Sequence, residues 1–349
     1  MSVRLLQKDA EFESAYAEFA GFIKLIGRGK KAGEYLTFSQ AERAMTLLLT
    51  QRVLPEQQGA FLMLLRMREE SVEELAGFLS ACRQTLPNVT NAEASLPQAD
   101  IDIGLYAGKR RHLPWHILAA LLLVKRGYRV FMHGTQEPGS GRLYLDNVWR
   151  RFGWHVANSA QHARELMELN GFCYMNLADV HEQMHHHIQL RELFGLRSCM
   201  NSLARMLNPS SARVNLQGVY HKHFDERHIS VAKRLNNDNV ACFRGDGGEV
   251  EVNPERPFTL HIHNQGQIQQ LHFPALLESW QVKPKSLDVS TMISCWCGNA
   301  DNLYGQQAVV GTLATMLCLL ESLTAEAAIA LASEIWLNRD RQWPGYRVN

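Results

Sequence analysis

The residues of this chain best suited to chemistry stand between positions 179 and 190, which read DVHEQMHHHIQL. His181, Glu182 and His185 form the pattern H-E-x-x-H, in which two histidines one helical turn apart bind zinc and the glutamate acts as a general base. No clear third ligand follows, and a stretch so rich in histidine matches a short motif readily by chance. We therefore expect a polar or basic helix face here and no metal site.

Positive charge is concentrated in the middle third of the chain. The whole chain has 36 Lys and Arg against 35 Asp and Glu, yet residues 104–234 have 18 against 9. Residues 1–103 have 11 against 14 and residues 235–349 have 7 against 12, while twelve of the fifteen histidines lie in the middle third. A basic segment of this kind favours an anionic ligand.

Several basic side chains of the middle third are spaced so that they can share a surface. Arg197 and Arg205 are eight residues apart and recur near one face if their segment is helical, although an ion pair with the N-terminal helices is a competing role for one of them. His221 and Lys222 follow a predicted strand, where α/β folds present ligand-contacting residues. For Arg191 and the histidines before it, a charged groove, a solvated face and a dimer seam all remain open.

The elements that must position these residues begin with a helical segment. Thr37 with Gln40 and Ser71 with Glu74 have the spacing of capping boxes, and Pro55 suits a first helical turn. Three or four short helices are therefore expected before the linker-like residues 87–100.

Short apolar segments then alternate with helical ones, which predicts a mostly parallel central sheet in a larger α/β domain. The predicted strands are 128–134, 153–157, 171–177, 212–220, 239–245 and 258–263, and the predicted helices include 110–127 and a region from 306 to 338 that Gly311 interrupts. The segment near 179–206 is helical in pattern. The expected domains are thus a helical domain at 1–95, joined by helices at about 179–206, and an α/β domain at 96–349.

Composition indicates the cellular compartment of the protein. The apolar runs fall short of the roughly 18 to 20 residues of a membrane-spanning helix, and the N-terminus has no apolar signal region. Seven scattered cysteines favour reduced thiols, so that Cys295 and Cys297 are expected to pack rather than bind metal. We predict a cytoplasmic protein with no membrane partner.

The motifs GRGKKAGEYLTFSQAERAMTLLL, VFMHG, LRELFGLRSCMNSLARMLNP, GVYHKH and FRGDGGEVEVNP resemble, in this order, the anthranilate phosphoribosyltransferases. The resemblance spans nearly the whole chain. It implies a helical domain that includes a mid-chain helical pair, an α/β domain, an active site between the two, and a homodimer formed through the helices.

The chain departs from that family where phosphate is bound. The family's G-T-G-G-D loop cradles phosphoribosyl pyrophosphate through backbone N–H groups, whereas DIDIGLYAGKRRHLPW keeps Gly104 and Gly108 but adds Tyr106 and three adjacent cations. The family also holds magnesium with an adjacent Asp and Glu, and here Glu249-Val250 follows the Gly-Asp-Gly turn, so that one carboxylate is missing. His133-Gly134 persists, but Thr135 replaces the usual Asn.

These departures resemble a divergent branch of the family that binds nucleic acid without sequence preference and whose loop reads like Tyr106 to Trp115. We accordingly predict a protein that binds DNA or RNA, without catalytic residues and without a cofactor. The expected nucleic-acid contacts are Lys109, Arg110, Arg111, Arg191, Arg197, Arg205, His221 and Lys222. A residual anion or ligand pocket is expected at Gly104, Tyr106, Gly108, His133, Gly134 and Asn208. The alternative is a phosphoribosyltransferase or other glycosyltransferase with an altered substrate, and only this alternative requires magnesium.

Overall fold

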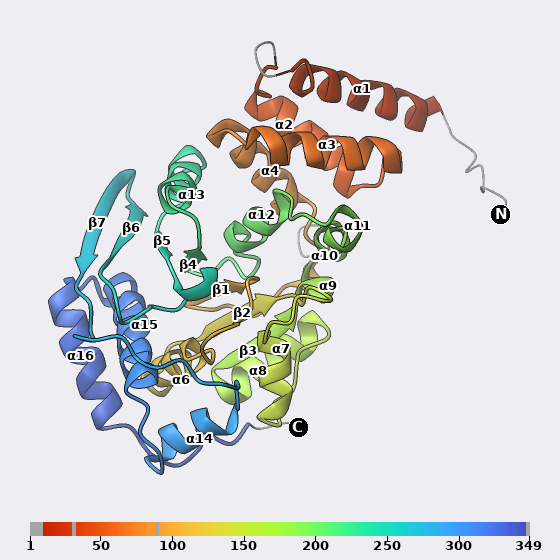
Figure 1. Cartoon of the computed structure of the whole chain (residues 1–349). Helices are drawn as coiled ribbons and strands as arrows, with labels where there is room; N and C mark the ends of the chain where they lie inside the picture. The colour runs from red at the N-terminus through yellow and green to blue at the C-terminus, as the bar shows by residue number, and fades with distance from the viewer. Residues whose placement is uncertain (1–9, 30–32, 88–90, 347–349) are drawn as a thin grey trace.

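The N-terminal part of the chain is helical. The computed structural model describes residues 10–29, 33–87 and 91–346. Its first four helices are α1 (Ala10–Ile26), α2 (Phe38–Leu49), α3 (Pro55–Arg68) and α4 (Val72–Gln84), which lie together at one end of the molecule (Figure 1). Both predicted capping boxes are present, because Thr37 accepts from the Gln40 N–H and Ser71 from the Glu74 N–H. The prediction of three or four short helices is confirmed.

A seven-stranded sheet forms the centre of the larger part, in the order β3-β2-β1-β4-β5-β6-β7. Its strands are β1 (Ile101–Leu105), β2 (Val130–Gly134), β3 (Phe172–Asn176), β4 (Val214–Val219), β5 (Val240–Arg244), β6 (Phe258–Asn264) and β7 (Gln267–Phe273). The first five are parallel, and β6 and β7 each run antiparallel to the strand before them. The predicted fold, a helical N-terminal domain with a mostly parallel α/β domain, is confirmed.

The remaining helices fall into two sets. Those of the α/β part are α6 (His116–Lys125), α7 (Leu145–Arg151), α8 (Ala160–Asn170), α13 (Phe224–Arg234), α14 (Ser290–Cys297), α15 (Leu303–Glu321) and α16 (Ala325–Leu337), with 3₁₀ turns η1 (Ala92–Ala94) and η2 (Asp246–Gly248). Those between the N-terminal helices and the sheet are α9 (Leu177–Val180), α10 (Glu182–Gln189), α11 (Arg191–Phe194) and α12 (Met200–Met206). Figure 1 shows that this second set bridges the two parts of the chain.

Two hydrophobic cores hold these layers together. One joins a face of the sheet to α6, α14, α15 and α16. The other joins the N-terminal helices and the mid-chain helices to the opposite face of the sheet, including Phe131 and Cys173. The Arg83 guanidinium on α4 also donates to the Met206 and Leu207 carbonyls at the end of α12. The helical part is therefore held firmly over the sheet, although the domain boundary at residue 95 stays a prediction.

Helix α15 is the single described helix that is long and apolar enough to cross a membrane. Its apolar window is 78% buried inside the protein, as is usual for a core helix. Gly311 lies within this helix, and a Cβ there would meet the Val252 side chain at 2.8 Å. The predicted interruption at Gly311 is thus wrong, because this glycine permits close packing while the helix ends before Ser322.

Three further differences separate the observed elements from the predicted ones. Residues 153–157 contribute only an isolated bridge from Ala157 to Met175, because Gly153 adopts a positive φ and Trp154 packs among aromatic rings. Strand β7 was not predicted, since its outward side chains are mostly glutamine on an exposed sheet edge and show little apolar alternation. Helix α6 also begins only at His116, after the turns that follow β1.

Candidate active site

A cleft of ≈ 530 Å³ opens where the parallel strands end and face the helical part. Its lining comes from the loops after β1, β4 and β5, from α12 and α13, and from Arg66 on α3. In parallel α/β sheets, ligands bind at the carboxyl ends of the strands. The volume falls within the roughly 300 to 1,000 Å³ of small-molecule sites.

Lys109, expected to contact phosphate, is instead buried and forms ion pairs inside the protein. Its side chain is 2% exposed, and Nζ donates to Asp246 Oδ2 and to Glu251 Oε1, the latter at 2.5 Å. Burial alone would lower the pKa of Lys109, but the charges of Glu251 and Asp246 raise it above its usual value. Burial by itself would raise the pKa of the Asp246 and Glu251 carboxyls, but the nearby charge of Lys109 lowers it. The net result is that both pKa values lie below their usual values. The three groups therefore form a buried, ionised triad.

Two backbone donors of the loop after β1 are likewise already satisfied. Glu249 Oε1 accepts from the N–H of Ala107, at 2.8 Å, and from the N–H of Gly108. Arg142 Nη1 braces the same loop by donating to the carbonyls of these two residues at 3.0 and 3.3 Å. A carboxylate of this chain thus occupies donors that could otherwise bind an external anion.

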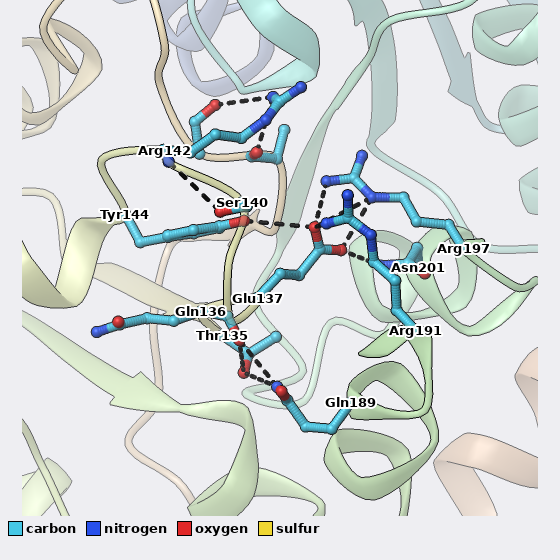
Figure 2. Close-up of polar contacts among 12 residues, drawn as sticks. Thr135, Gln136, Glu137, Ser140, Arg142, Tyr144, Gln189, Arg191, Arg197 and Asn201 are labelled. Carbon is cyan, nitrogen blue, oxygen red and sulfur yellow. Dashed lines mark hydrogen bonds and ion pairs between the residues drawn. The ribbon is translucent and has the colours of Figure 1, made fainter. Parts of the chain in front are cut away.

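A third internal site surrounds Glu137, which lies in the loop after β2 (Figure 2). Its carboxylate accepts from Arg197 Nη2 at 2.7 Å, from Asn201 Nδ2 at 3.0 Å and from Arg191. Arg197 therefore pairs with a carboxylate of the α/β part, and not with a carboxylate of the N-terminal helices. Arg191 and Arg197 bind this carboxylate as a clamp, which restrains them from acting as free surface cations.

The other basic candidates have different surroundings. Arg110 and Arg111 are exposed and line the cleft, as does His221. Lys222 is exposed but faces a second, smaller pocket of ≈ 280 Å³. Arg205 is 8% exposed and lines the cleft, so that it can reach a ligand only from inside it.

The expected residual pocket is not a cleft surface. Tyr106 Oη contacts His133 Nδ1 at 2.5 Å, and His133 Nε2 contacts Asp102 Oδ1 at 3.1 Å, all three being buried. Gly104 is in β1 beside this chain of contacts, and Gly134 packs against the Leu105 carbonyl. Asn208 fixes a turn through both backbone groups of Ala212. None of these six residues is part of the cleft lining, although Tyr106 and Gly108 belong to the loop after β1 that contributes to it.

The H-E-x-x-H segment has a structural explanation. His181 is the N-cap of α10, where its Nδ1 accepts from the Met184 N–H, while Nε2 contacts Thr85 Oγ1 at 3.0 Å. His185 Nδ1 contacts Thr135 Oγ1 at 2.9 Å. Within the described ranges, no three His, Cys, Asp or Glu side chains form a group that could hold a metal ion.

Three glutamates that organise the site were missed from the sequence. Glu137 and Glu251 are buried partners of cations far along the chain, and Glu249 was considered only as part of a damaged magnesium motif. The spacing of Asp246, Glu249 and Glu251 was the available signal, because successive acidic residues after a strand end can converge on one cation. Their partners could not be read from the local pattern.

The residues present do not fit the magnesium ion that the family resemblance implies. Two carboxylates do converge, since Glu251 supplies the second one that seemed to be missing beside Asp246. The Lys109 ammonium, however, lies between them, and Glu251 Oε2 also accepts from the His116 backbone N–H at 3.0 Å. An ammonium and a divalent cation cannot share this position.

The α/β architecture with a cleft between its sheet and a helical part defines the class of protein, and comparison with known proteins agrees. Residues 23–86 match the helical bundle domain of a glycosyl transferase family, and residues 117–326 match its α/β domain. The chain belongs to this glycosyl transferase family. It is 29% identical over 232 residues to the anthranilate phosphoribosyltransferase of Methylocella silvestris, an alignment that covers 66% of this chain and 64% of that enzyme.

Another anthranilate phosphoribosyltransferase, from Symbiobacterium thermophilum, is 27% identical over 67% of this chain and 68% of its own length. The fold is that of the Thermus thermophilus enzyme, with a TM-score of 0.71, 19% identity, and coverage of 90% of this chain and 93% of that one. The structure of the Saccharomyces cerevisiae enzyme in complex with phosphoribosyl pyrophosphate and magnesium has a TM-score of 0.69 and 17% identity. This match covers 92% of this chain and 94% of that one. The resemblance to the anthranilate phosphoribosyltransferase family is confirmed.

The prediction that the chain is a nucleic-acid-binding protein is wrong. The relatives found are anthranilate phosphoribosyltransferases, and they favour the transferase alternative. The geometry gives the physical reason, because Lys109, Arg191 and Arg197 are neutralised by carboxylates of the same chain and Arg205 is buried. The homodimer and the cytoplasmic location stay predictions.

Proposed function

We propose that this chain is a divergent glycosyl transferase that moves a pentosyl group from a phosphorylated donor to an acceptor bound in the same cleft. The observation that carries the proposal is the charge of the cleft in this family fold. Apart from Lys109 and Arg197, which are paired with carboxylates, seven Arg and Lys side chains line it, and its lining has the two carboxylates of Asp246 and Glu255. A concave site of one sign of charge concentrates ligands of the opposite sign, which suits a phosphorylated sugar.

The transfer breaks the bond between the anomeric carbon and the phosphate oxygen, and the electron pair leaves with the phosphate. A nucleophilic atom of the acceptor forms the new bond to that carbon and loses its proton to solvent. Negative charge therefore grows on the leaving group, and fixed cations beside it lower the barrier. The exposed Arg110, Arg111, Arg256 and Lys283, which line the same cleft, are the side chains available for this role.

The site favours a donor that binds without magnesium. Lys109 fills the position between Asp246 and Glu251, and Glu249 occupies two loop N–H groups. A donor with a single phosphate needs only the cationic side chains, whereas a diphosphate normally needs a metal to neutralise its developing charge. We therefore expect a pentose 1-phosphate to be a better donor than phosphoribosyl pyrophosphate.

The test is to measure release of phosphate or pyrophosphate from ribose 1-phosphate and from phosphoribosyl pyrophosphate, each with a panel of aromatic amine and nucleobase acceptors. We expect turnover that persists in EDTA and falls at least tenfold in Arg110→Ala/Arg111→Ala, because cations that meet a developing charge act mainly on the transition state. The charge-matched control is Arg43→Ala/Arg126→Ala, which removes two partly exposed ion pairs outside the cleft lining.

Each result has a defined meaning. Absence of turnover with every donor and acceptor contradicts the transferase proposal. Turnover that EDTA abolishes and magnesium restores contradicts the proposal that Lys109 takes the place of a metal ion. Equal losses of turnover in the two double variants exclude a specific role for Arg110 and Arg111.

A further inference from the structure

The last strand of the sheet, β7, has an open edge. It stands at the end of the strand order and pairs with β6 alone, and Figure 1 shows it at the outer side of the sheet. No backbone group of the described residues outside β6 hydrogen-bonds to the backbone of β7. An edge strand of this kind presents a row of N–H and C=O groups with which another strand can pair.

The turn between β6 and β7 determines which backbone groups face outward. It consists of Gln265 and Gly266, whose φ angles of 48° and 73° fit the two-residue hairpin turn with two positive φ values. The pair that closes such a turn, here Asn264 and Gln267, is hydrogen-bonded, and hydrogen-bonded pairs alternate with pairs that are not. The residues of β7 whose N–H and C=O groups point away from β6 are therefore Ile268, Gln270 and His272.

The devices that usually protect a sheet edge are absent from β7. Natural edge strands are kept from pairing by charged side chains, proline, a bulge or a short length. Residues 267–273 read QIQQLHF, with no Lys, Arg, Asp or Glu and no proline, and they pair with β6 in consecutive positions without a bulge. Ile268 is 44% exposed, and Gln267 and Gln270 are exposed as well. The edge is accordingly long, regular and accessible to a second strand.

The arrangement of the outward groups is symmetric, which selects the partner. Ile268 and His272 lie two residues on either side of Gln270, so antiparallel strands of two identical copies can be related by a two-fold axis through that residue. Gln270 then faces Gln270 of the second copy, Ile268 faces its His272, and each outward N–H and C=O group has a partner. No Lys, Arg, Asp or Glu side chains oppose each other in this register.

We propose that β7 is an interaction surface for a second copy of this chain, whose β7 pairs with it in antiparallel orientation about Gln270. A strand of another protein would need no such symmetry, whereas a two-fold contact requires it. One strand of 7 residues buries less area than the roughly 1,200 Å² of a stable interface, so the association should be weak and depend on protein concentration. Because β7 belongs to the α/β part, this contact is separate from a homodimer formed through the helices, and it does not depend on the proposed function.

Cross-linking tests the register. Gln270→Cys places two thiols beside the two-fold axis, where the Cα atoms of a hydrogen-bonded pair lie about 5.5 Å apart, close enough for a short bifunctional thiol reagent. Gln267→Cys is the matched control, because Gln267 is exposed on the same strand but would lie about 20 Å from Gln267 of the second copy. Gln270→Cys should form the linked dimer roughly tenfold faster than Gln267→Cys, because pairing raises the local thiol concentration. The parent protein gives the background from Cys297, the one described cysteine that is not buried.

A charge substitution tests the reversible association. Gln270→Lys places two ammonium groups directly opposite each other across the axis, which opposes pairing. Gln267→Lys adds the same charge at the end of the strand, where it faces Phe273 of the second copy. In sedimentation, the average mass of the parent and of Gln267→Lys should rise with protein concentration, and Gln270→Lys should lose this rise. Both side chains are exposed, so both variants should keep the unfolding temperature of the parent.

The outcomes decide for or against the contact. Preferential linking at position 270, together with loss of association in Gln270→Lys, supports pairing through β7. Equal linking of the two cysteine variants, equal association of the two lysine variants, or a parent protein whose mass does not change with concentration would overturn it.

Discussion

At the scale of single residues, the fate of Lys109 decides what the cleft can bind. A buried ammonium between two carboxylates supplies a fixed positive charge where a metal ion would need open ligands. Removing one partner of a buried ion pair leaves an uncompensated charge, which typically costs about 3–5 kcal/mol. Lys109→Met should therefore destabilise the protein by about that amount at neutral pH and free Asp246 and Glu251 to bind a divalent cation.

The measurement is urea unfolding with and without Mn²⁺, together with the loss of free Mn²⁺ signal in electron paramagnetic resonance. Mn²⁺ should bind to Lys109→Met and restore part of its stability, whereas the parent and the exposed neighbour variant Arg110→Met should show neither effect. A Lys109→Met protein as stable as the parent and without Mn²⁺ affinity would show that the triad is not a cation site.

At the scale of elements, the turn after β5 places both glutamates that shape the site. Gly245 begins this turn, and a Cβ there would lie 1.8 Å from the Glu249 carbonyl oxygen. Gly245→Ala must therefore shift the backbone that holds Glu249 against the β1 loop, and we expect a destabilisation of about 1–3 kcal/mol. Thermal unfolding of the variant measures this loss.

Gly21 provides the opposite case within the same chain. It is exposed in the interior of α1, and a Cβ there meets nothing within 4 Å. Gly21→Ala should stabilise the protein by up to about 1 kcal/mol, because alanine loses less backbone entropy in a helix. If both alanines shift the unfolding temperature in the same direction, the steric explanation of the Gly245 turn fails.

At the scale of the whole molecule, buried histidines make stability depend on pH. Burial lowers the pKa of His181 and His187 to about 4, and that of His228 to about 3. The unfolded chain binds these three protons below about pH 6.5 but the folded chain does not, so the free energy of unfolding falls as pH drops from 6.5 toward 4. Glu70 opposes this in part, because burial raises its pKa to about 7.

The expected net slope near pH 5.5 is roughly 2 kcal/mol per pH unit, measurable by urea unfolding between pH 7 and pH 5. His181→Asn keeps a side chain able to cap α10 but cannot titrate, so it should reduce the slope by about 1 kcal/mol per pH unit. Stability that is constant from pH 7 to pH 5 would contradict the neutral state of these histidines.

The charge asymmetry along the chain also has its explanation at this scale. Cations of the basic middle third pair with carboxylates of the acidic flanks, as Arg227 does with Glu69, Arg234 with Glu73 and Arg126 with Glu321. The sequence alone predicts that the middle third binds an external polyanion, and these pairs show why that prediction is wrong. Within the described ranges, four of its cations, including Lys109, instead pair with carboxylates of the two flanks, and others line the cleft.

The sequence by itself determined the features that depend on near neighbours. The capping boxes at Thr37 and Ser71, the parallel strands and the family resemblance all follow from residues within a few positions of one another, whose preferences act locally. It also indicated that the loop after β1 had changed, because Lys109, Arg110 and Arg111 stand where glycines were expected.

Only the tertiary structure decided what those changed residues do. Lys109 meets Glu251 across 142 positions, Gly108 meets Glu249 across 141 and Arg197 meets Glu137 across 60. A cation that stands alone in the sequence is an expected ligand contact, but the same cation beside a buried carboxylate is neutralised. Since burial and charge pairing depend on chain segments brought together by the sheet and its covering helices, no local pattern distinguishes Lys109 from the exposed Arg110 next to it.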